Sequence, residues 1–135
     1  AQGGVGLRDP HGHVTEGLHR ARALAPDLRV VTSVVVDGEL RFGLERRGPA
    51  KLHGAYANVM QIIEVLPLPP EAAQPYATLR AHLESQGQPI GPNDALIAAH
   101  ALALGATLVS GDDEFAGVPG LKVENWLKPL DVPGV

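Results

Sequence analysis

Cysteine is absent from this chain of 135 residues. Its absence excludes disulfides, thiolate metal sites and a cysteine nucleophile, and it is compatible with the reducing cytoplasm. No apolar run approaches the ~20 residues that a membrane-spanning helix needs, and the polar, glycine-rich N-terminus does not resemble a signal peptide. We therefore expect a cytoplasmic protein that has no membrane partner.

Aromatic residues are scarce, at 4% of the chain, and charged residues make up only 19%. Hydrophobic residues reach 44%, so Leu, Val, Ile and Ala must supply the core. The charge content is too low for a disordered chain, and the length suits one domain of ordinary size. We expect a single domain over residues 1–135, with a loose tail at 128–135.

An excess of positive charge is also lacking, because the formal net charge is -4 at pH 7. A protein that binds nucleic acid by charge alone would be basic. A nucleic-acid ligand would therefore require a metal ion or a local basic patch, for which Arg41, Arg46, Arg47 and Lys51 are candidates. The ordinary alternative is that these residues form the solvated face of a helix and the turn after it.

Short apolar runs alternate with helical patterns along the chain. Strands are predicted at 29–32, 64–68, 107–110 and 121–124, and helices at 33–47, 50–63, 70–86 and 93–104, after an earlier helical pattern between 9 and 26. Ser33 is a predicted N-cap and Gly105 a predicted helix end. The alternation indicates an α/β domain with a largely parallel sheet, in which ligands bind outside the carboxyl ends of the strands.

Three acidic residues stand out against this pattern. Asp94 begins a nearly all-apolar helix, and Asp112 follows the strand after that helix. Glu39 lies in the helix that Ser33 caps, where helical spacing places it beside Val35 and Val36 and toward the buried side. The first two positions place carboxylates at the edge of the sheet where ligands bind.

Each acid also has an ordinary explanation. Asp94 would complement the dipole of its helix, Asp112 would form an Asx turn with Asp113 and Glu114, and Glu39 would be a solvated helix residue. Taken together, however, clustered carboxylates suit a hard divalent cation such as Mg²⁺. Such a site activates water and stabilises the charge that develops on a phosphate during hydrolysis. A zinc site is disfavoured, since the chain has neither cysteine nor a helical His-x-x-x-His pair.

Three segments carry a resemblance to a known family. They read TSVVVDGELRFGLERR, PIGPNDALIAAHALALGATLVSGDDEF and VPGLKVENWL. In this order they resemble the PIN-domain ribonucleases, and in particular the VapC-type toxins of toxin–antitoxin pairs, over residues 9–127. The resemblance implies a three-layer α/β domain with a central, largely parallel sheet. It also implies Mg²⁺ or Mn²⁺ bound by a quartet of acids, cleavage of tRNA or another structured RNA, an antitoxin partner and a homodimer.

The resemblance assigns metal-binding and catalytic roles to the same three acids. Glu39 matches the glutamate of the second helix, Asp94 the aspartate that begins the long apolar helix, and Asp112 the acid after the next strand. Ser110 matches the usual small hydroxyl residue beside that last acid. Asp113 is the nearest alternative to Asp112.

The N-terminus departs from the family pattern. The family begins with an apolar strand whose end supplies the first metal-binding aspartate, whereas residues 1–7 read AQGGVGL here. We interpret residues 3–6 as a flexible terminus, with the missing aspartate falling before residue 1 and Asp9 as a possible substitute. An alternative function is therefore a catalytically impaired module that binds an antitoxin and dimerises. A third is a metal-dependent phosphohydrolase that acts on small substrates.

Overall fold

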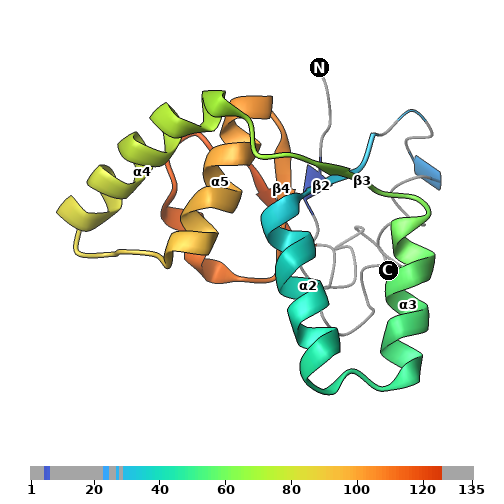
Figure 1. Ribbon diagram of the computed structural model, residues 1–135. Coiled ribbons are helices and arrows are strands. Elements are labelled where there is room, and N and C mark those ends of the chain that lie inside the picture. Colours follow the sequence, from blue (N-terminus) through green and yellow to red (C-terminus); the bar gives the residue numbers. More distant parts are fainter. Residues whose placement is uncertain (1–4, 7–22, 25–26, 28, 126–135) are drawn as a thin grey trace, which may run out of the picture.

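The computed structural model describes residues 5–6, 23–24, 27 and 29–125 (Figure 1). The elements are, in chain order, β1 (Val5–Gly6), β2 (Val31–Ser33), α2 (Val34–Arg47), α3 (Ala50–Met60), β3 (Glu64–Leu66), the 3₁₀ helix η1 (Pro70–Ala72), α4 (Ala73–Ser85), α5 (Pro92–Leu104), β4 (Thr107–Val109), the 3₁₀ helix η2 (Asp113–Gly117) and β5 (Val123–Glu124). The predicted elements between 29 and 124 are all present. The predicted helical pattern at 9–26 falls largely outside the described residues, and the predicted tail at 128–135 falls wholly outside them.

All the described strand pairs are parallel. One group has the order β1-β4-β5 and the other consists of β2 and β3. Strands β1 and β2 are in contact, which brings the two groups together at the centre of the fold. The α/β class with a parallel sheet is thereby confirmed.

Strand β1 corrects the expectation of a flexible N-terminus. Val5 pairs with Thr107 and Gly6 with Leu108, in parallel register with β4. Two residues, one of them glycine, carry no recognisable strand pattern, because glycine is depleted in strands and contributes no side chain to the packing. This strand is therefore specified by the neighbouring β4 ladder rather than by its own sequence.

The helix ends follow the chemistry that the sequence predicts. Ser33 caps α2, since its Oγ accepts a hydrogen bond of 3.0 Å from the backbone N–H of Val36. Gly105 ends α5 in the left-handed conformation, with φ of 64°, which favours glycine. The turn from Pro70 to Ala72 is 3₁₀ rather than α, in a segment where Pro69, Pro70 and Pro75 cannot donate backbone hydrogen bonds.

The core lies around α5, whose Ala95, Ala98 and Ala99 are fully buried. Helix α4 packs against α5 and contributes the buried side chains of Leu79 and Leu83. Small alanine side chains let α4 and the sheet approach α5 closely, which suits a core with few aromatic residues. Among the described residues, no helix is both long and apolar enough to cross a membrane.

Helices α2 and α3 run side by side away from the strands (Figure 1). Helix α3, all of which the structure describes, contains no fully buried residue. The body of the domain therefore consists of α4, α5 and the strands, and α2 connects it to the more exposed α3.

Candidate metal centre

Asp94 is held at the start of α5. It is the third residue of the helix, after Pro92 at the first helical position, and only 7% of it is exposed. The chain reverses direction at Gly105, so α5 and β4 run in opposite directions. The start of α5 therefore lies at the same end of the fold as the carboxyl end of β4. The acid thus lies at the edge of the sheet where ligands bind in parallel α/β folds.

The chain beyond β4 folds into a turn that orients a second acid. The buried Ser110 accepts a hydrogen bond of 3.0 Å at Oγ from the backbone N–H of Asp112. Asp112 accepts one of 3.0 Å at Oδ1 from the backbone N–H of Glu114. The Asx turn considered as an ordinary alternative is therefore present, and it is compatible with a ligand role, because this bond engages only one carboxylate oxygen.

Three carboxylates meet at this place. Asp94, Asp112 and Glu114 each offer an oxygen atom, and these oxygens all lie within 4.8 Å of one another. Asp94 is buried, Asp112 is half-buried and Glu114 is exposed, so the cluster is open on one side. Carboxylates this close repel one another, and a hard divalent cation with oxygen ligands would remove the repulsion. The donor set therefore fits a hard divalent cation.

Glu39 contacts the residue that precedes Asp94 in the chain. Its half-buried side chain on α2 accepts a hydrogen bond of 3.2 Å at Oε1 from Nδ2 of Asn93. Asn93 directly precedes Asp94 in α5. Glu39 is thus brought to the start of α5, although it is not one of the three residues whose oxygens lie within 4.8 Å of one another.

Glu114 was not predicted as a site residue. Asp113, the predicted alternative to Asp112, is exposed and is not part of the described cluster. The sequence does contain the pattern that predicts this position. An Asx turn that begins at Asp112 brings residue i+2, here Glu114, back toward that aspartate. Asp9, the possible substitute for the first aspartate, lies outside the described residues.

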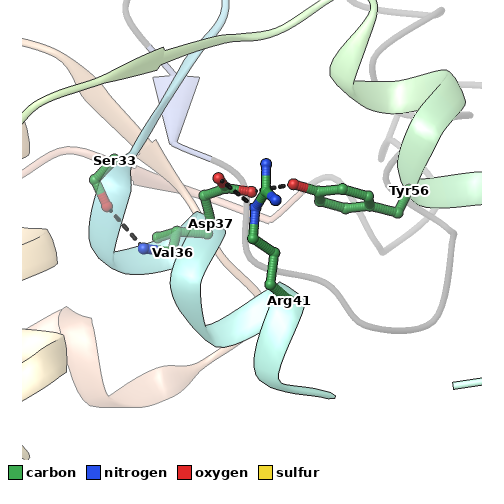
Figure 2. A network of polar contacts seen from close by, with 5 residues as sticks. All are labelled: Ser33, Val36, Asp37, Arg41 and Tyr56. Carbon is green, nitrogen blue, oxygen red and sulfur yellow. Dashed lines mark hydrogen bonds and ion pairs between the residues drawn. The ribbon is translucent and has the colours of Figure 1, made fainter. Parts of the chain in front are cut away.

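The predicted basic patch is partly neutralised. Arg41 donates from Nε to Asp37 Oδ2 at 3.0 Å, while the Tyr56 hydroxyl donates to the other oxygen of Asp37 (Figure 2). The hydrogen bond and the charge of Asp37 raise the pKa of Arg41, and Arg41 lies 5.6 Å from the centroid of the Tyr56 ring. Arg46 lies over the exposed ring of Phe42 instead. Arg41 is thus already held by an acid and an aromatic ring.

A second polar feature lies in the core. Thr32 and His100 are each 3% exposed and line one cavity between β2 and α5. Neither Thr32 Oγ1 nor His100 Nδ1 has a hydrogen-bond partner among the described residues. Burial lowers the pKa of His100, because the charged imidazolium is poorly solvated there.

A parallel α/β domain with carboxylates gathered at one edge is the architecture of a known family. The PIN domain model matches residues 12–121, and the chain belongs to the PIN-domain family. Within it, the chain is related to the VapC ribonuclease toxins of VapBC toxin–antitoxin systems.

Individual relatives support this placement. Ribonuclease VapC2 of Rickettsia felis is 34% identical over 107 residues, which cover 78% of this chain and 80% of the relative. The tRNA(fMet)-specific endonuclease VapC of Salmonella typhimurium is 32% identical over 100 residues, covering 73% of this chain and 76% of the relative. A crystal structure of VapBC2 from Rickettsia felis, bound to a DNA fragment from their promoter, matches with a TM-score of 0.77 and 27% identity, over 90% of this chain and 98% of the solved one.

Proposed function

We propose that this protein is a metal-dependent endoribonuclease toxin that hydrolyses phosphodiester bonds in RNA. The observation that carries the proposal is the meeting of Asp94, Asp112 and Glu114, whose oxygens lie within 4.8 Å of one another. Relatives that cover most of this chain are named ribonucleases, which supports this activity. The ion proposed is Mg²⁺ or Mn²⁺, since both prefer carboxylate and water oxygens.

The four acids contribute in different ways. A divalent ion bound here supplies a Lewis acid that lowers the pKa of water and stabilises charge on the phosphate. Asp94 is buried and fixed by the first turn of α5, and the turn after Ser110 orients Asp112. Glu114 is exposed and can adjust to the ion, while Glu39 lies beside the cluster through Asn93. Two fixed carboxylates beside an open side thus position a phosphodiester for in-line attack.

The proposed substrate is tRNA or another structured RNA. One relative that is 32% identical is named a tRNA(fMet)-specific endonuclease, which supports a folded RNA as the substrate class. Because the net charge is -4, the bound ion and exposed cations must offset repulsion from the RNA backbone. Lys51 and Arg46 are exposed and suit this role, whereas Arg41 already interacts with Asp37.

The proposed partners are an antitoxin protein and a second copy of this chain. Solved relatives were crystallised as VapBC toxin–antitoxin complexes, which supports an antitoxin as a partner. We further propose that the protein acts in the cytoplasm, where its RNA substrate and a reducing environment are found.

Cleavage of a labelled tRNA pool tests the activity. We expect cutting with Mn²⁺ that stops with EDTA and falls at least about 100-fold in Asp94→Asn, because loss of even an outer-shell partner of a metal typically costs 10–100-fold. Glu114→Gln should also lose most activity. The matched control is Asp113→Asn, which removes a neighbouring exposed acid outside the cluster and should cut normally. Cutting that persists in EDTA or in Asp94→Asn would overturn the proposal.

The impaired binding module is a second candidate, and one observation favours it. The described residues of β1 are Val5 and Gly6, and neither carries a carboxylate. A folded protein that binds an antitoxin but cuts no RNA in the same assay would support this candidate. If the unaltered chain does cut RNA, a loss of cutting in Asp9→Asn would show that Asp9 replaces the first-strand aspartate.

A further inference from the structure

Asn93 connects two elements that are far apart in the sequence. Its side-chain Nδ2 donates to Oε1 of Glu39 at 3.2 Å, and the two residues are separated by 54 positions. Asn93 belongs to the first turn of α5 and Glu39 to α2, and these helices are in contact. The bond therefore fixes a carboxylate of α2 relative to the start of α5.

The side chain of Asn93 is not used to cap its own helix. The N-cap of α5 is Gly91, which has no side chain, and its carbonyl accepts from the N–H of Ala95 at 2.9 Å. Asn has a lower helix propensity than Ala, because its amide competes for backbone hydrogen bonds. A role of Asn93 in its own helix therefore does not explain its contact with Glu39.

An amide suits a place beside several carboxylates. It donates a hydrogen bond without a charge, so it neither adds to the repulsion among Asp94, Asp112 and Glu114 nor neutralises them as Lys or Arg would. A glutamate side chain loses rotamer freedom when it is ordered. A hydrogen bond formed before the ion arrives reduces that loss.

We propose that Asn93 is a positioning residue that holds the Glu39 carboxylate beside Asp94 for a divalent cation. The inference rests on the proposed function only in assuming that the Asp94 cluster binds the ion. Ligand binding is stronger when the groups that receive the ligand are already held in place. Partners that orient metal-binding groups typically change metal affinity by about 10–100-fold.

Calorimetric titration of the purified full chain with Mn²⁺ tests this role without depending on activity. Asn93→Leu keeps the size of the side chain but removes the donor, and we expect it to weaken Mn²⁺ binding about 10-fold. Asn93→Gln retains an amide and should recover part of the affinity. Asn58→Leu, on the exposed surface of α3, is the matched control and should bind as the unaltered chain does. Melting temperatures without metal should agree among all variants, because the Asn93 contact is exposed.

A double-mutant cycle shows whether Asn93 acts through Glu39. In a Glu39→Gln background, Asn93→Leu should have little further effect on Mn²⁺ affinity, whereas a general structural role would give additive losses. Equal Mn²⁺ affinity of Asn93→Leu and the unaltered chain would overturn the inference. If Asp94→Asn nevertheless abolished binding, the proposed metal site would remain. If Asp94→Asn also bound normally, the proposed site itself would fail.

Discussion

The Tyr56→Phe substitution removes one hydroxyl group. We expect it to destabilise the protein more than the loss of a single oxygen atom suggests. The Tyr56 hydroxyl donates to Asp37, whose side chain is only 10% exposed and also accepts from Arg41 (Figure 2). A hydrogen bond to a charged group contributes about 1.5–3 kcal/mol, and a buried acceptor that loses its partner forfeits that amount. We expect Tyr56→Phe to lower the free energy of unfolding by about 1.5–3 kcal/mol.

Tyr76→Phe is the matched control for this substitution. Tyr76 is also half-buried, and its hydroxyl accepts from Arg80 at 2.9 Å. The Arg80 side chain is 42% exposed and also binds Glu84, so it can exchange the lost partner for water. We expect Tyr76→Phe to cost less than about 1 kcal/mol, because the charged donor stays solvated when it loses the tyrosine.

Urea denaturation followed by circular dichroism measures both costs, and a cycle with Asp37→Asn measures the coupling. The absorbance of the tyrosinate reports the pKa of Tyr56 and gives a second readout of the same contact. Burial raises the pKa of Tyr56 first, and the hydrogen bond to Asp37 and its charge raise it further. Asp37→Asn should therefore lower the pKa of Tyr56. If Tyr56→Phe cost no more than Tyr76→Phe, the interpretation of the Tyr56 bond as a strong hydrogen bond to a buried, charged acceptor would be wrong.

Two further predictions concern the core and the start of α2. Burial lowers the pKa of His100 below its usual 6.5, so the unfolded chain binds more protons. Stability should then fall as the pH drops through 6.5, by up to about 1.4 kcal/mol per pH unit from this residue. His100→Gln should flatten that dependence in urea denaturation, and an unchanged slope would contradict it. Ser33→Ala removes the cap of α2 and should cost about 1 kcal/mol, whereas Ser85→Ala, which loses only an exposed bond to the His82 carbonyl, should cost much less.

The features that sequence could predict are local ones. The Ser33 cap, the Gly105 helix end and the irregular start before α4 each depend on residues within a few positions. Their dihedral preferences and hydrogen-bonding groups act whatever the rest of the chain does. Interior pairing is different, and β1 shows why: Val5 and Gly6 form a strand only because β4 lies beside them.

The same distinction applies to the site. Asp94 and Asp112 were predicted because each lies at the end of a regular element, and the structure brings them together. Glu114 was missed although a local turn carries it there. Asn93 could not be predicted as a partner of Glu39, since their contact depends on how α2 docks against α5. Sequence periodicity gives the face of a helix but not the helix that it meets.

Two buried aspartates show why burial alone does not identify a metal ligand. Asp37 and Asp94 are both 7% exposed and both lie in the first turns of helices. Asp37 has Arg41 and the Tyr56 hydroxyl around it, so the protein itself compensates its charge. Asp94 has the carboxylates of Asp112 and Glu114 beside it, and like charges gathered in this way favour a cation that joins them. The first aspartate therefore ties two helices together, and the second is placed where a cation would bind.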